Sequence, residues 1–160
     1  MKKKIILGAD RLAIPLKDEL KKYLEEQYGM EVEDVGMQAG GEFISYIDTA
    51  CRAAGEIAKG HFERGILLCG TGAGMSLVAN KHKRIRAVIC QTPYEAAMCR
   101  TINDANIMCM GGNLVTPVMG KLMVDAFLST PFKEAFPADR HEFLEFARKE
   151  MDRIEDENFK

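Results

Sequence analysis

Five short apolar runs alternate along the chain with longer runs in which apolar residues recur at helical spacing. The short runs cover residues 4–8, 30–36, 64–69, 85–90 and 105–112, and the helical runs cover residues 12–29, 43–60, 74–83, 93–104 and 116–129. This alternation predicts parallel strands in one sheet, with helices packed on both faces. We therefore expect an α/β fold, a three-layer α/β/α sandwich around a five-stranded, mostly parallel, Rossmann-like sheet.

The last part of the chain has a different character. It is rich in charge, and Phe143, Phe146 and Ile154 recur in it at helical spacing. This pattern predicts an extra C-terminal helix over about residues 138–157, which packs on the domain or on a partner subunit. Because 160 residues suit one hydrophobic core, we expect residues 1–160 to form a single domain.

The composition argues against several classes of protein. A net charge of −2 gives no attraction to nucleic acid or to an anionic membrane, and no apolar run is long enough to cross a bilayer. The five cysteines contain no CxxC pair, which favours free thiols in a reducing cytoplasm. Cys90, Cys99 and Cys109 lie in or near apolar segments, and we expect them to be buried. The histidines show no metal-ligand spacing.

The predicted sheet indicates where a ligand would bind. In parallel sheets ligands bind at the edge formed by the carboxyl ends of the strands. Three segments are expected there: residues 8–11 after the first strand, residues 69–74 after the third, and residues 103–113 around the fifth.

The segment after the third strand has an unusual composition, because Cys69 is followed by Gly70, Gly72 and Gly74. Glycines remove the Cβ atoms that would block a ligand, and the N–H groups of such a loop favour an anion. The same N–H groups would favour the thiolate form of Cys69. The spacing fits neither the Rossmann fingerprint nor the P-loop. Two interpretations stay open: a reactive thiol on an anion-binding loop, or a turn with an incidental cysteine.

Longer stretches of the sequence are similar to a known family. The segment GILLCGTGAGMSLVANK, with GAD after the first strand, SYID (45–48) and NDAN (103–106), resembles the ribose-5-phosphate isomerase B and galactose-6-phosphate isomerase family over about residues 3–130. The resemblance implies an enzyme, an aldose–ketose isomerase (an intramolecular oxidoreductase) of small sugar phosphates. It also implies that no metal and no organic cofactor are needed.

The resemblance further implies a role for each motif residue. Cys69 would be the base that moves a proton between carbons 1 and 2 through an enediolate. Thr71 would assist proton transfer at the substrate oxygens, and the amides of Gly70 to Gly74 would hold the enediolate oxygen. Asp10 and Asn103 would bind sugar hydroxyls, and Tyr46 would line the pocket.

The sequence departs from the family pattern at the positions that handle the ring and the phosphate. Arg11 stands where the family usually has His, and Ile102 stands where the ribose enzymes have a ring-opening His, although an isoleucine cannot transfer a proton. Asn113 stands where the family often has an Arg for phosphate. Arg11, with Arg140 and His141 in the altered C-terminal segment, remains a candidate for the phosphate.

Three interpretations follow from these departures. The chain is an active isomerase whose substrate, such as a tetrulose phosphate, needs no assisted ring opening; or it is one subunit of a hetero-oligomeric galactose-6-phosphate isomerase; or it is a non-catalytic sugar-phosphate-binding homologue. The family builds each site across two subunits. The resemblance therefore also implies a homodimer or a dimer of dimers with shared sites, or assembly with a paralogous subunit.

Overall fold

The computed structural model describes residues 3–159 and contains the expected five-stranded sheet. Its strands are β1 (Lys4–Ala9), β2 (Glu31–Asp34), β3 (Gly65–Cys69), β4 (Ala87–Ile89) and β5 (Ile107–Gly111). Their order across the sheet is β2-β1-β3-β5-β4, and every pairing among the described strands is parallel. The prediction of a mostly parallel sheet is confirmed; β1 is one residue longer than its apolar run, and the other four strands are shorter than theirs.

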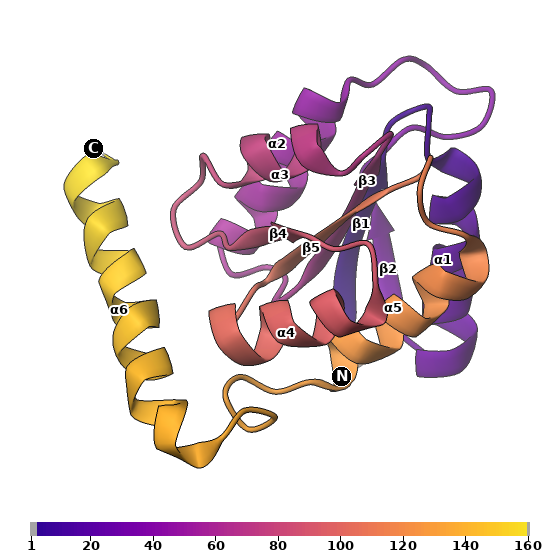
Figure 1. Cartoon of the computed structure of the whole chain (residues 1–160). Coiled ribbons are helices and arrows are strands. Elements are labelled where there is room, and N and C mark those ends of the chain that lie inside the picture. The colour runs from indigo at the N-terminus through magenta and orange to yellow at the C-terminus, as the bar shows by residue number, and fades with distance from the viewer. Residues whose placement is uncertain (1–2, 160) are drawn as a thin grey trace.

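Helices cover both faces of the sheet, as the alternation predicted (Figure 1). They are α1 (Ile14–Tyr28), α2 (Tyr46–Ala58), α3 (Ala73–Ala79), α4 (Pro93–Asn103) and α5 (Pro117–Ser129). Helix α2 begins three residues later than expected because the Ser45 hydroxyl caps it and accepts a hydrogen bond from the Asp48 amide at 3.1 Å. None of the helices within residues 3–159 is both long and apolar enough for a bilayer crossing.

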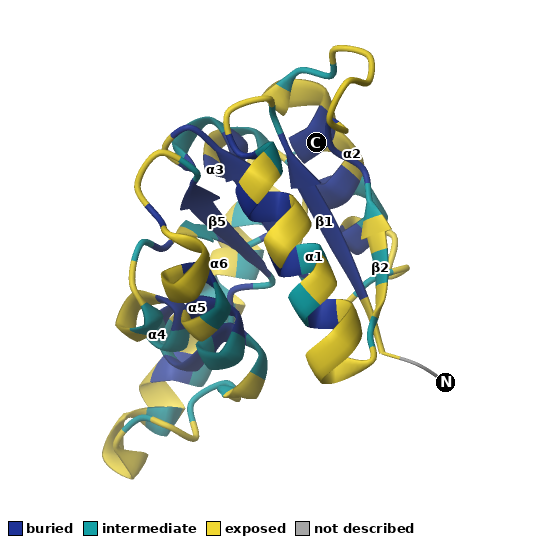
Figure 2. Ribbon diagram, turned by 90° about the vertical axis from the view of Figure 1, so that its right-hand side faces the viewer, coloured by how far each residue is buried: buried dark blue, intermediate teal, exposed yellow. Residues whose placement is uncertain are grey.

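The alternation of side chains along each strand divides the core into two layers. Ile5, Leu7 and Leu68 pack with α1, α4 and α5, whereas Ile6, Leu67 and Cys69 pack with α2 and α3. Figure 2 shows the resulting pattern on α1, which turns a buried stripe to the sheet and an exposed face to solvent. Cys69 therefore belongs to the α2/α3 layer. Cys90, Cys99 and Cys109 are buried, as predicted.

The C-terminal helix is present over the expected range. A 3-10 turn (Ala138–Arg140) leads into α6 (His141–Asn158), which lies beside the sandwich on the side of β4 and α4 (Figure 1). Ion pairs hold it there, because Arg84 contacts Glu155 at 2.7 Å and Asp156 at 2.6 Å. Leu144 is the residue of α6 that is buried, and other large apolar side chains of α6 stay exposed, namely Phe143, Phe146, Met151 and Ile154.

Candidate active site

The sheet topology places two of the candidate segments side by side. The chain first moves outward from β1 to β2 and then crosses back to β3 on the other side of β1, so β1 and β3 are neighbours at a switch in strand order. The Asp10 amide donates to the Leu68 carbonyl at 3.1 Å. Asp10 and Cys69 therefore lie at the same edge of the sheet, at the position where open α/β sheets bind ligands.

The loop after Cys69 is fixed by hydrogen bonds to its carbonyl groups. The carbonyl oxygens of three consecutive residues, Cys69, Gly70 and Thr71, accept from Gly112 N at 2.7 Å, Asn113 N at 3.1 Å and Gln91 Nε2 at 2.9 Å, respectively. In a trans peptide the N–H group points away from the carbonyl. The three amides that follow these carbonyls therefore face the opposite side of the loop.

One of those amides is directed at the thiol. The Gly72 N–H donates to Cys69 Sγ at 3.1 Å. Gly72 has a φ of 84°, in the left-handed region that glycine adopts without strain, and this conformation turns the chain from the loop into α3. The Gly72 amide therefore fixes the position of the Cys69 sulfur beside the first turn of α3.

The close approach of β5 to this loop also depends on glycine. A Cβ atom on Gly111 would lie only 2.9 Å from the Gly70 carbonyl oxygen and 2.9 Å from Thr71 Cα. Since side chains are excluded there, the backbone of β5 and its following loop can bond directly to the Cys69 loop. The glycines of both segments thus hold one rigid array of backbone donors.

Two cysteines of the α2/α3 layer differ in their chemistry. Cys109 is fully enclosed on β5, and burial, with the nearby charge of Cys69, raises the pKa of its thiol far above the physiological range. Cys109 therefore stays a neutral thiol. Cys69 is 6% exposed, lies at the end of its strand and receives the Gly72 amide, so it is the thiol of this pair that is suited to proton transfer.

Four further candidates surround the loop. The Asp10 carboxylate accepts from the Leu12 amide at 2.9 Å, which fixes its orientation, and Arg11 beside it is exposed. The ring of Tyr46 packs on the first turn of α3, because a Cβ atom on Gly74 would lie 2.7 Å from it. Asn113 places its side-chain amide near Gly70. The structure thus brings Asp10, Arg11, Tyr46 and Asn113 together with the loop of Cys69, Gly70, Thr71, Gly72 and Gly74.

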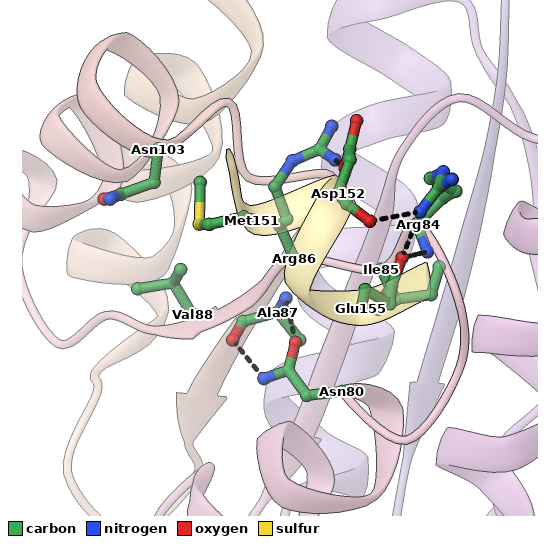
Figure 3. A pocket seen from close by; sticks show the side chains of 10 residues that line it. All are labelled: Asn80, Arg84, Ile85, Arg86, Ala87, Val88, Asn103, Met151, Asp152 and Glu155. Carbon is green, nitrogen blue, oxygen red and sulfur yellow. Dashed lines mark hydrogen bonds and ion pairs between the residues drawn. The ribbon is translucent and has the colours of Figure 1, made fainter. Parts of the chain in front are cut away.

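Asn103 does not lie with this group, and the expectation that the whole segment 103–113 shares the ligand edge is wrong. Asn103 ends α4 and precedes β5, so it lies at the amino edge of the parallel sheet, whereas Asn113 follows β5 at the carboxyl edge. Asn103 lines a cavity of about 310 Å³ beneath α6, with Arg86 and Met151 (Figure 3). Within one chain it is therefore separated from Cys69 by the length of the sheet.

Arg140 and His141 are also found away from the Cys69 loop. Both follow α5, which carries the chain back toward the amino edge, and the connecting segment bonds there to α4 through Lys133 N and the Thr101 carbonyl at 2.8 Å. Arg140 is exposed, and a ring nitrogen of His141 lies 2.8 Å from the Phe136 carbonyl. The sequence motifs therefore form two groups, one at each edge.

One residue at the carboxyl edge was missed by the sequence analysis. Gln91 follows β4, and its side chain bonds to Thr71 of the Cys69 loop and to Gly111 of β5. Its position directly after the fourth apolar run, residues 85–90, was the signal available in the sequence, since the residues that follow the strands of a parallel sheet lie at the ligand edge.

Comparisons with known proteins agree with this geometry. A family model described as Ribose/Galactose Isomerase matches residues 5–144. The chain is 40% identical over 153 residues to a 4-deoxy-4-sulfo-D-erythrose isomerase of Clostridium sp. (strain MSTE9), covering 96% of each chain. It is 40% identical over 129 residues to a D-erythrulose-4-phosphate isomerase of Pectobacterium atrosepticum, covering 81% of this chain and 84% of that protein.

A solved structure with the same fold covers nearly the whole chain. The structure of Clostridium thermocellum ribose-5-phosphate isomerase B aligns with a TM-score of 0.85 and 34% identity, covering 96% of this chain and 98% of the other. The similarity therefore extends over the sheet and its helices.

Proposed function

This chain belongs to the ribose/galactose isomerase family, and from this premise we propose that Cys69 moves a proton between the first two carbons of a four-carbon sugar with an acidic group on its last carbon. Membership makes the chain an aldose–ketose isomerase of the sugar-phosphate class. The roles of the side chains and the choice of sugar are our proposal. The observation that carries it is the Gly72 amide, which donates to Cys69 Sγ at 3.1 Å.

The reaction needs one group that accepts and returns a carbon-bound proton. In the open-chain aldose, the Cys69 thiolate takes the proton from carbon 2. The electrons of that C–H bond form the carbon–carbon double bond of an enediolate, and the negative charge moves to the oxygen on carbon 1. The Thr71 hydroxyl gives that oxygen a proton and takes one from the hydroxyl on carbon 2. The Cys69 thiol then delivers its proton to carbon 1, which yields the ketose.

Backbone amides supply the stabilisation of the enediolate. The N–H groups of Gly70 and Thr71 have no hydrogen-bond acceptor within residues 3–159, and they lie on the side of the loop opposite its bonded carbonyls. Preformed donors of this kind stabilise charge as it develops on a substrate oxygen. Asp10 accepts a hydrogen bond from a sugar hydroxyl, and the Tyr46 ring forms a wall of the site.

The length of the sugar follows from Ile102. A furanose ring of a four-carbon aldose needs a free hydroxyl on carbon 4. When carbon 4 carries a phosphate ester or a sulfonate, that hydroxyl is blocked or absent, and the sugar stays open. No ring-opening acid or base is then required, which agrees with an isoleucine at position 102.

The similarity to an isomerase of a four-carbon sulfo sugar favours a sulfonate over a phosphate on carbon 4. The match to the Clostridium 4-deoxy-4-sulfo-D-erythrose isomerase also extends into the C-terminal helix. We therefore propose 4-deoxy-4-sulfo-D-erythrose as the preferred substrate.

An assay with three sugars tests this choice. We expect kcat/KM for 4-deoxy-4-sulfo-D-erythrose to exceed that for D-erythrose 4-phosphate by about tenfold and that for D-ribose 5-phosphate by about 100-fold, since one or two mismatched polar contacts cost about 1–3 kcal/mol. Ketose formation is followed by NMR. Equal or faster turnover of ribose 5-phosphate would contradict the four-carbon proposal.

The same assay separates the other two interpretations. If turnover arises only when a second homologous chain is added, the protein is a subunit of a hetero-oligomeric isomerase. If the sugars bind, by calorimetry, but are not converted under either condition, it is a non-catalytic binding protein. We propose the first interpretation, activity of the chain by itself.

We also propose that each site takes residues from two copies of the chain. Asn103 has a role implied by the family resemblance, and Arg140 and His141 are candidates for binding the acidic group, but all three lie at the edge opposite Cys69. A second copy that presents its amino edge to the Cys69 loop would unite both groups, and a two-fold dimer forms two such sites.

Mixing two inactive variants tests the shared site. Cys69→Ala and Asn103→Ala chains are each expected to be strongly impaired, but a mixed dimer contains one site with both native residues. After refolding at equal concentrations, about a quarter of the wild-type activity is expected, because half of randomly formed dimers are mixed and each has one intact site of two. Cys69→Ala mixed with Asp10→Ala is the control, since both residues come from one chain. The shared site would be contradicted if both mixtures recovered equal activity, or if neither mixture recovered any activity.

We place the reaction in the cytoplasm. All five cysteines are free, including the exposed Cys51, and free thiols persist in a reducing compartment.

A further inference from the structure

Gln91 connects two segments of the carboxyl edge through its side chain. Its Nε2 donates to the Thr71 carbonyl at 2.9 Å, and its Oε1 accepts from the Gly111 amide at 3.3 Å. Its own backbone is fixed as well, because the Gln91 amide donates to Glu95 Oε2 at 2.7 Å. Glu95 belongs to the capping box that begins α4. The side-chain amide therefore extends from a rigid base.

The Thr71 carbonyl differs from its two neighbours in how it is held. The Cys69 and Gly70 carbonyls accept hydrogen bonds from the backbone amides of Gly112 and Asn113, whereas the Thr71 carbonyl accepts one from a side chain. This peptide group also contains the Gly72 N–H, which donates to Cys69 Sγ. The orientation of that N–H group therefore depends on the hydrogen bond from Gln91 to the Thr71 carbonyl. Among the hydrogen bonds to the three loop carbonyls, this is the one that a point substitution can remove.

We propose that Gln91 is a positioning residue for the reaction, which holds the Thr71–Gly72 peptide so that its N–H group stays directed at the Cys69 sulfur. Glycine at position 72 leaves this peptide free to rotate once the Thr71 carbonyl is released. Rotation would withdraw the donor from the sulfur and change the line of amides that faces the substrate oxygen. The catalytic part of this inference rests on the proposed function, whereas the effect on the Cys69 sulfur does not.

Two substitutions test the role of the side-chain amide. Gln91→Met keeps the length of the side chain but removes both hydrogen bonds. Gln91→Glu keeps the shape and the acceptor for Gly111 N but replaces the donor to Thr71 by a carboxylate oxygen. Gln27→Met makes the same chemical change at an exposed position of α1 and is the control. All variants carry Cys51→Ser, so that the exposed Cys51 does not react with thiol reagents.

Two measurements read out the effect. The first is kcat and KM with the four-carbon sugars. The second is the rate of alkylation of Cys69 by iodoacetamide without substrate, followed by mass spectrometry across a pH series. The plateau rate at high pH reports access to the sulfur, whereas the pH of half-maximal rate reports stabilisation of the thiolate. A purely structural role of Gln91 would change the plateau and the thermal stability but not the midpoint.

For Gln91→Met we expect kcat to fall by about tenfold or more with KM within about threefold, because misplaced donors act mainly on the transition state. The pH of half-maximal alkylation should rise by about half a unit or more, because the thiolate loses the hydrogen bond from Gly72. A shift of this size is expected, since one pH unit corresponds to only about 1.4 kcal/mol. Gln91→Glu should behave likewise, and Gln27→Met should match the background.

An unchanged midpoint in Gln91→Met would overturn the inference, whatever its activity. If Gln91→Met does not fold, Gln91→Leu, which is also uncharged and removes both hydrogen bonds, decides by the same criterion. If no sugar is converted by the native chain, the proposed function fails, but the midpoint still supports or overturns the positioning role.

Discussion

Replacing Cys69 by alanine is expected to lower kcat by about 10²- to 10⁴-fold, the range that a positioned general base contributes. The substitution removes only the sulfur atom from a side chain that is 6% exposed. The strand and the layer of core residues from α2 and α3 can both accommodate the smaller alanine. The protein should therefore stay folded, as circular dichroism will check, and KM should change little because the sugar contacts remain. Turnover of the four-carbon sugars is the measurement.

The exposed Cys51 on α2 offers a matched control. Cys51→Ala makes the same change outside the loop and should retain full activity. Deuterium incorporation gives a second readout, since a base that exchanges its proton with solvent introduces deuterium at the carbon it reprotonates. A Cys69→Ala enzyme that keeps more than about a tenth of native kcat would assign the base to another residue.

Lys17→Met is expected to cost about 3–5 kcal/mol of unfolding free energy, the usual effect of removing one partner of a buried ion pair. The Lys17 ammonium is fully buried; it lies 2.7 Å from Asp34 Oδ2 and donates to the Met37 carbonyl at 2.7 Å. The Asp34 side chain is 5% exposed, so without Lys17 its carboxylate is left in a site with little water. Urea unfolding measures the loss, which is large beside a typical total of about 5–15 kcal/mol.

Two variants give this prediction its controls. Lys22→Met changes a lysine of the same helix whose side chain is 69% exposed, and it should cost less than about 0.5 kcal/mol. The double variant Lys17→Met with Asp34→Asn removes the unpaired charge and should recover part of the loss. If Lys17→Met costs no more than Lys22→Met, the buried pair does not support the fold as described.

The sheet and its helices were predictable because their signals are local and repeated. Each strand is a compact apolar run, and each helix has apolar residues on one face, as with Leu16, Leu20 and Leu24 of α1. The ends were less accurate. The second strand was expected over residues 30–36, whereas β2 covers Glu31–Asp34; the amides of Val35 and Met37 still donate to the Leu7 and Ala9 carbonyls of β1 beyond the end of the regular strand.

The candidate site was predictable only where strand position determines it. Cys69 and Asp10 end adjacent parallel strands, so their proximity follows from the fold. Asn103 was misplaced because closeness in sequence to β5 does not say which end of the strand a residue adjoins. Gln91 was missed because its side chain bonds to the backbone of Thr71 and Gly111, each 20 positions away in the sequence. A local sequence pattern does not report contacts over such a distance.

The fixed loop carbonyls have a consequence for changing the specificity of the enzyme. The proton-transfer frame consists of the Cys69 sulfur, the Thr71 hydroxyl and main-chain groups held by the backbone after β5 and by the Gln91 side chain, so it does not depend on which side chains recognise the sugar. Positions 11, 102 and 113 can therefore be exchanged as a set while the frame is preserved. Redesign toward longer sugars should begin with these three positions and leave the glycines untouched.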